Sequence, residues 1–154
     1  MDLIDRKIIA ALQDDATLSV QRISERVGLS HTPCWRRIQR LERAGVIKSR
    51  VAIVEPRALG LGLSVFVSVS TDDHSMEWRD RFAAAVAAMP EAMELYRMAG
   101  DVDYLLRVVV PDMDAYDAFY KRLTERVAIR SITARFAMEA LKSTTAYPVD
   151  TVSR

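Results

Sequence analysis

The sequence predicts an α+β chain of two domains, and three observations support this. The N-terminal third carries helically spaced apolar residues with a tight turn between two helices. The remainder alternates strand and helix patterns in the order β-α-β-β-α-β. Positive charge is also uneven: residues 21–50 hold eight Lys or Arg against two acidic residues, whereas residues 51–154 hold twelve against fifteen. Such asymmetry favours a nucleic-acid-binding domain joined to a second module.

Composition excludes several classes of protein. Half of the 154 residues are hydrophobic and only five are proline, which is typical of a folded chain. The single cysteine, Cys34, excludes an internal disulfide and a cysteine-based metal cluster. No apolar run approaches the ~20 residues of a membrane span, and charged residues begin at Asp2, so we expect a cytoplasmic protein without membrane contact. We expect no cofactor and no metal.

The first helical pattern starts with Asp2 and Asp5, acidic residues that favour a helix N-terminus. Residues 19–44 then predict two helices and a turn of about three to four residues, the spacing of a helix-turn-helix. Ser19 and Ser30 are the expected N-caps, and Gly28 is expected to end the first of these two helices. The predicted three-helix core consists of Leu3, Ile8, Leu12, Ile23, Val27, Leu29, Cys34, Ile38 and Leu41.

Two short β patterns, Val46–Lys48 and Val51–Val54, follow the third helix. Two strands in this position form a wing, so residues 1–54 are predicted to be a winged helix-turn-helix domain. Pro56, Gly60 and the residues around them predict a linker over 55–62.

The third helix carries a dense basic face opposite its apolar stripe. An isolated helix of this kind is more often only a solvated surface, but the uneven charge favours double-stranded DNA as the partner. For Trp35, a structural role in which it only covers the edge of the core fits the sequence as well as a DNA contact does. We expect base contacts at the start of the helix, from Ser30, His31, Thr32, Trp35 and Arg36, and phosphate contacts from Arg37, Arg40, Lys48 and Arg50.

Residues 63–154 predict a ferredoxin-like βαββαβ sandwich, with two helices on one face of a four-stranded antiparallel sheet. The other sheet face has no cover of its own, which predicts a homodimer and hence two recognition helices for two DNA half-sites. Residues 142–154 are expected to extend the last strand and then to be disordered. The predicted strands are Leu63–Thr71, Ala92–Met98, Tyr104–Val110 and Ile129–Leu141, and the helices are Met76–Met89 and Met113–Val127.

Several motifs resemble those of the Lrp/AsnC (feast/famine) family of prokaryotic transcription factors. Leu29–Arg37, Arg40–Glu42 and Gly45–Ile47 resemble its recognition segment, and Pro90–Glu91 with Gly100–Val108 resemble its effector-domain signature. The resemblance covers nearly the whole chain. It implies a DNA-binding regulator, dimers that assemble further to tetramers, octamers or larger forms, and a small amino acid bound between dimers.

Within that family, three stretches look most like a subgroup of cysteine-sensing regulators of sulfur amino acid catabolism: Thr32–Trp35, His74–Trp78 and Arg97–Gly100. Departures from the family pattern occur at Val102 in the effector signature, at Val127–Ile129 before the last strand and at Ser49–Arg50 in the wing.

The resemblance places the amino-acid effector at the Gly-Asp turn. Asp101 and Asp103 offer acceptors for its ammonium group, and the backbone N–H groups of the turn offer donors for its carboxylate. The alternative is that both aspartates only shape a hairpin. Thr133 and Arg135 are expected to complete the pocket from a neighbouring subunit. The full expected set is Met98, Ala99, Gly100, Asp101, Val102, Asp103, Tyr104, Thr133 and Arg135.

Two other functions remain open on the sequence. An enzyme could use paired carboxylates, but His31 and His74 lie in different predicted domains, Cys34 lies on an inner stripe, and no phosphate-binding Gly loop is present. An architectural DNA-binding protein would keep the first domain and use the second only for assembly. Calorimetric titration with amino acids separates this reading from a regulator.

Overall fold

A computed structural model describes residues 1–149 of the chain. It divides into two compact units, each described here by itself. The N-terminal unit contains Met1–Ile53 together with the tail that begins at Lys142, and the C-terminal unit is Val54–Leu141. The sequence assigned the tail to the second domain, whereas its described part, 142–149, contacts the first helix of the chain. The disorder expected at the very end of the chain concerns residues outside the described part.

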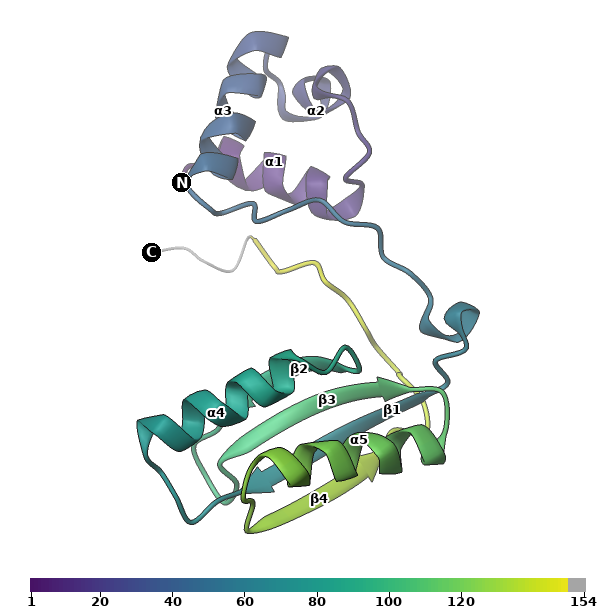
Figure 1. Ribbon diagram of the computed structural model, residues 1–154. Helices are drawn as coiled ribbons and strands as arrows, with labels where there is room; N and C mark the ends of the chain where they lie inside the picture. Colours follow the sequence, from purple (N-terminus) through teal and green to yellow (C-terminus); the bar gives the residue numbers. More distant parts are fainter. Residues whose placement is uncertain (150–154) are drawn as a thin grey trace. The chain divides into compact units, whose positions relative to one another are not determined.

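The N-terminal unit is built from three helices that pack in a helix-turn-helix arrangement (Figure 1). Seven buried apolar residues from all three helices form the core of this unit: Ile8, Leu12, Ile23, Val27, Cys34, Ile38 and Leu41. Leu3 was predicted to belong to this core but is 63% exposed, because it lies on the outer side of the first helix. Leu29 is only partly buried. The helices are α1 (Leu3–Asp14), α2 (Val20–Val27) and α3 (His31–Arg43).

The ends of these helices follow the predicted capping residues. Asp2 caps α1 through a capping box with Asp5, and the Ser19 side chain accepts from the Arg22 backbone N–H. Gly28 ends α2 with φ 71°, a left-handed conformation that glycine adopts without steric cost. Ser30 occupies the N-cap position of α3, but its side chain makes no capping hydrogen bond.

The two predicted wing strands, Val46–Lys48 and Val51–Val54, are not formed. Residues 48–54 instead run as an irregular segment, and Val51 and Ile53 are 67% and 73% exposed. Two strands this short make few hydrogen bonds, and an isolated two-stranded hairpin is marginal in water. The segment therefore occupies the place of a wing without a strand ladder. In the linker that follows, Pro56–Leu59 form a single 3-10 turn.

The C-terminal unit is a four-stranded antiparallel sheet with strand order β2-β3-β1-β4 and two helices. This is the predicted ferredoxin-like sandwich. The third strand was predicted with its observed bounds, whereas the fourth was predicted too long at both ends. The elements are β1 (Leu63–Ser70), α4 (Met76–Ala87), β2 (Ala92–Arg97), β3 (Tyr104–Val110), α5 (Met113–Arg126) and β4 (Ser131–Phe136).

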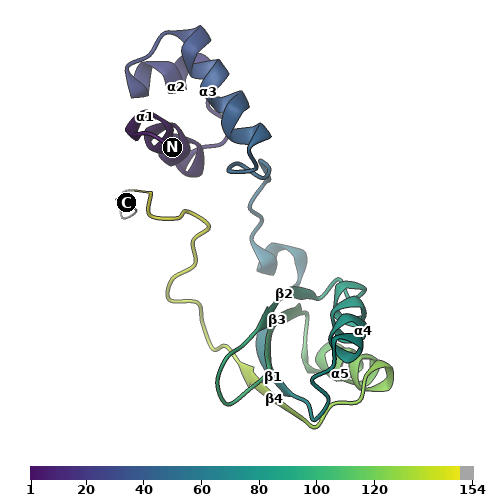
Figure 2. The same cartoon turned by 90° about the vertical axis from the view of Figure 1, so that its left-hand side faces the viewer.

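Both helices cover the same face of the sheet, as Figure 2 shows. On the inner side of α4, the ring of Phe82 stacks on that of Trp78 with their centroids 5.0 Å apart. The centroid of Phe82 also lies 4.9 Å from that of Tyr104 in β3. The buried Trp78 indole also donates to the backbone carbonyl of Ala128 at 2.8 Å, which ties α4 to the segment before β4. These contacts fix the sheet and helices as one core.

The opposite face of the sheet is open and partly apolar. At its centre Phe66, 40% exposed, lies in register between Arg107 and Arg135 of the neighbouring strands. Arg107 pairs with Glu94 at 2.8 Å, and Arg135 donates to the Ser68 hydroxyl at 2.9 Å. A patch of this kind combines an apolar centre with charges that are already partnered, as protein interfaces do.

Among the described residues, no helix has both the length and the apolar character needed to cross a membrane.

Candidate nucleic-acid and effector sites

The recognition helix α3 places its basic residues on two different sides. Cys34, Ile38 and Leu41 are buried and define the inner side. Opposite them lie three exposed residues spaced by four and seven positions, which we call the outward stripe: Thr32, Arg36 and Arg43. Within residues 1–149 the side chains of Arg36 and Arg43 form no ion pair or hydrogen bond. Both guanidinium groups are therefore available to a ligand outside the chain.

The N-terminal end of α3 is accessible, as the predicted base contacts require. His31 and Thr32 are exposed, and the Ser30 hydroxyl is not used for capping. Trp35 is 46% exposed, so about half of its ring surface is open to a partner. Polar and aromatic groups at the start of a recognition helix are the ones that reach base edges in other helix-turn-helix proteins.

Arg37 and Arg40, predicted as phosphate contacts, bind carboxylates of the N-terminal unit itself. The Nη1 of Arg37 donates to Asp2 at 2.6 Å and to Asp5 at 2.8 Å. The Nη2 of Arg40 donates to both oxygens of Asp5, at 2.8 and 2.7 Å. Asp5 is only 1% exposed, whereas Arg40 is 61% exposed, so the network joins a buried carboxylate of α1 to partly exposed arginines of α3.

The same network sets the protonation state of its acids. The Asp5 backbone N–H and the Arg37 side chain lower the pKa of Asp2 from its ordinary 3.8 to about 2. Burial by itself raises the pKa of Asp5, but the hydrogen bonds from the Asp2 backbone and Arg37, with the charge of Arg40, outweigh it and lower that pKa. Both carboxylates are therefore ionised at neutral pH.

Of the two cations in the wing segment, Arg50 is paired within the described residues of the unit and Lys48 is not. Arg50 pairs with Glu42 at 2.9 Å, and Glu42 also accepts from Gln39. Lys48 is exposed and, in the part of the chain that the structure describes, has no ion-pair partner. Arg43 was not among the predicted DNA contacts, although its spacing of seven from Arg36 places both on one helix face and could have revealed it.

The predicted effector turn joins β2 to β3. Its ends are closed by hydrogen bonds from Met98 N–H to Asp103 O at 2.8 Å and from Asp103 N–H to Val69 O at 3.0 Å. Gly100 has φ 144°, a conformation that L side chains rarely adopt, although a Cβ there would meet nothing within 4 Å. The glycine is therefore required by the backbone rather than by close packing.

The two aspartates of this turn have different surroundings. Asp103 accepts from the Thr71 backbone N–H at 2.9 Å, and its other oxygen lies 3.7 Å from His74 Nδ1. Asp101 is exposed and has no hydrogen bond or ion pair within residues 1–149. The hairpin-shaping role weighed for both residues therefore applies to Asp103, while Asp101 keeps a free carboxylate.

The remaining predicted effector residues do not all gather at the turn. Tyr104 is 8% exposed and points into the core against Trp78 and Phe82. Thr133 pairs in register with Ser68 of β1, which separates it from β3 by one strand. Arg135 is farther along β4 on the same open face. Within one chain, Thr133 and Arg135 are thus separate from the turn, whereas Met98, Ala99 and Val102 are part of it.

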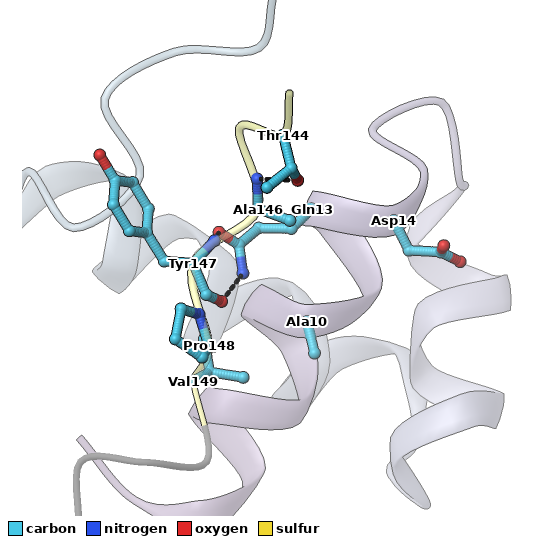
Figure 3. A pocket seen from close by; sticks show the side chains of 8 residues that line it. All are labelled: Ala10, Gln13, Asp14, Thr144, Ala146, Tyr147, Pro148 and Val149. Carbon is cyan, nitrogen blue, oxygen red and sulfur yellow. Dashed lines mark hydrogen bonds between the residues drawn. The ribbon is translucent and has the colours of Figure 1, made fainter. Parts of the chain in front are cut away.

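A groove of about 470 Å³ lies between α1 and the C-terminal tail (Figure 3). The tail backbone at Tyr147 is bound by the Gln13 side chain, and Figure 3 shows Pro148 and Val149 continuing along the helix. No local pattern in the sequence indicates this contact, because Gln13 and Tyr147 are 134 positions apart.

No group of three or more His, Cys, Asp or Glu side chains in the described part of the chain is placed to hold a metal ion. Cys34 is fully buried, and burial raises the pKa of its thiol, which disfavours the reactive thiolate.

Comparison with protein families gives two matches that follow one another along the chain. Residues 1–48 match the family described as winged helix-turn-helix DNA-binding, and residues 64–147 match that described as the Lrp/AsnC ligand binding domain. Over 151 residues the chain is 49% identical to the DNA-binding transcriptional activator DecR of Escherichia coli K12, covering 97% of this chain and 99% of DecR.

Solved structures give the same result. An AsnC family transcriptional regulator from Agrobacterium tumefaciens is 54% identical, with a TM-score of 0.95 over 99% of this chain and 100% of that one. A transcriptional regulator from Neisseria meningitidis in complex with L-Met is 34% identical, with a TM-score of 0.92 over 97% of each chain.

Proposed function

Because this chain belongs to the Lrp/AsnC family of DNA-binding transcriptional regulators and carries the ligand-binding domain of that family, we propose that a bound amino acid controls its assembly on specific DNA sites. DNA recognition is assigned to α3, and effector binding to the turn between β2 and β3.

The outward stripe of α3 is the observation that carries the DNA assignment. Arg36 and Arg43 have no partner within residues 1–149, and the polar residues at the start of the helix are exposed. We assign base contacts to Ser30, His31, Thr32, Trp35 and Arg36, and phosphate contacts to Arg43 and Lys48, whereas Arg50 is paired with Glu42.

The open face of the C-terminal sheet is the proposed dimer interface. Phe66 is exposed there in a single chain, beside ion-paired arginines that a second copy could cover. A two-fold dimer brings two copies of α3 to two half-sites, and further association of dimers to tetramers or octamers extends the contact with DNA.

For the effector we propose a sulfur-containing amino acid, cysteine or one related to it. The regulator from Neisseria meningitidis, 34% identical, was solved with L-Met, which supports this class. The sequence stretches that resemble cysteine-sensing regulators support cysteine in particular. Asp101, with its free carboxylate, is the proposed acceptor for the ligand ammonium group, and Thr133 and Arg135 reach the pocket from a neighbouring subunit.

Two measurements on the full chain test the proposal. Duplexes enriched from a random-sequence library by the purified protein should share one motif and bind more tightly than unselected DNA. In a thermal-shift panel of cysteine, methionine, leucine and glutamate, a sulfur amino acid should raise the unfolding temperature most, since a ligand that binds only the folded state stabilises it by mass action.

The outcomes separate the alternatives. Failure to enrich any motif refutes sequence-specific regulation. An enriched motif without a thermal shift from any amino acid favours the architectural protein, in which the C-terminal unit serves only assembly.

A further inference from the structure

The N-terminal unit buries one carboxylate, that of Asp5, against two arginines of the recognition helix. Carboxylates are almost never fully buried unless they are paired, and Asp5 is 1% exposed. Its Oδ1 accepts from both Arg37 and Arg40, at 2.8 Å each. Its Oδ2 accepts from Arg40 at 2.7 Å and from the Asp2 backbone N–H at 3.0 Å. Asp2 adds a second carboxylate on Arg37 at 2.6 Å.

We propose that Asp5 is a positioning residue that limits sequence-independent DNA binding: it holds the guanidinium groups of Arg37 and Arg40 against α1 and so withholds them from DNA phosphates. Phosphate charge then comes from the outward stripe and the wing segment. This inference rests on the proposed DNA-binding function.

Charged side chains and base-reading side chains contribute differently to DNA binding. Cations in contact with phosphates supply the affinity for any DNA sequence, whereas contacts to base edges supply discrimination. Asp2, Asp5, Arg37 and Arg40 together carry no net formal charge. Binding the two arginines internally therefore lowers affinity for random DNA while leaving the start of α3 unchanged. Contacts to base edges then supply a larger share of the binding free energy on a specific site.

The geometry favours this role over that of a simple stabilising ion pair. Removing the Asp5 carboxylate from water costs free energy that its ion pairs must first offset, so these pairs are weak evidence of a net gain in stability. Arg40 is still 61% exposed, so its side chain has the reach to find a phosphate once Asp5 no longer binds it. A purely structural role predicts a change in unfolding temperature but none in the salt dependence of DNA binding.

The test measures affinity for random-sequence duplex DNA across a salt series, using the full chain. Arg43→Ala should reduce the slope of log affinity against log salt by about 1 per bound subunit, as expected for one lost phosphate contact. Arg40→Ala should reduce it by less than about half of that. Asp5→Asn should steepen the slope and tighten random-DNA binding several-fold, and the double change Asp5→Asn with Arg40→Gln should reverse both effects.

Asp15→Asn is the matched control. It removes one negative charge from the same unit, at an exposed carboxylate that accepts from Thr17 rather than from an arginine. It should leave the slope unchanged.

Equal losses of slope for Arg43→Ala and Arg40→Ala overturn the inference but leave DNA binding intact. So does an Asp5→Asn variant that behaves like Asp15→Asn. If Asp5→Asn does not fold, as judged by circular dichroism, the comparison of Arg43→Ala with Arg40→Ala decides the question. Absence of any DNA binding by the unmodified chain overturns the proposed function and this inference with it.

Discussion

The side chain of Gln13 binds the backbone of Tyr147 through both of its polar atoms. Its Nε2 donates to the Tyr147 carbonyl at 3.0 Å, and its Oε1 accepts from the Tyr147 N–H at 2.7 Å. Replacing Gln13 by Ala should release the tail from α1 at a cost of about 0.5–1.5 kcal/mol per hydrogen bond. Faster hydrogen exchange at the Tyr147 amide would report the release. Gln21→Ala, which removes a bond to Glu25 within α2, should leave that amide unchanged.

Phe66 offers a direct test of the proposed dimer. An aspartate at this position, on the open sheet face, should place a charge in the interface and shift the chain to monomers in light scattering. The monomer should still fold, since Phe66 is 40% exposed in a single chain. Met138→Asp, at a residue that is 92% exposed, is the control. A Phe66→Asp variant with the mass of the unmodified assembly would place the interface elsewhere.

The two aspartates of the effector turn should respond differently to replacement by Asn. Asp101→Asn should leave the unfolding temperature of the free protein unchanged and reduce the shift caused by the effector, because its carboxylate has no partner within the described residues. Asp103→Asn should lower the unfolding temperature itself, because it weakens the bond from Thr71 N–H, a loss of about 1–3 kcal/mol. The assignment fails if Asp101→Asn preserves the full ligand shift.

The lowered pKa of Asp2 predicts an acid dependence of stability. Because hydrogen bonds from the Asp5 N–H and Arg37 lower this pKa from 3.8 to about 2, the ionised form contributes stability above about pH 4. That contribution should disappear as the pH falls from 4 towards 2. Thermal unfolding by circular dichroism across this range should therefore show a flatter pH dependence for Asp2→Asn. The exposed Glu139→Gln variant should keep the slope of the unmodified chain; an equally steep slope in Asp2→Asn would refute the assignment.

Local patterns were sufficient to predict most of the fold. Helical spacing and capping residues such as Ser19 and Gly28 act within one turn of chain, so the three helices followed from them. The wing strands failed because a strand needs a partner, and the spacing of Val51 and Ile53 carries no information on whether one is present. The bounds of β3 were predicted correctly, since its apolar run lies between two other strands and is strongly buried.

The sites were predictable only where they depend on helix periodicity. Periodicity places Arg36 outward and could have separated it from Arg37, but Arg40 is four positions from Arg36 and lies on the same side of the helix. Asp5, the partner of Arg37 and Arg40, lies 32 and 35 positions away from them, and only the folded packing of α1 on α3 brings it to them. The contact between the tail and α1 could not be predicted for the same reason, because Gln13 and Tyr147 are far apart in the sequence.

The docking of the tail on α1 means that the DNA-binding unit is discontinuous along the chain. During translation the three helices emerge before the C-terminal unit and can pack at once, whereas the segment around Tyr147 emerges after that unit. The surface along Gln13 is therefore uncovered for as long as the C-terminal unit is being synthesised. The order of synthesis places attachment of the tail after the synthesis of both the helices and the sheet.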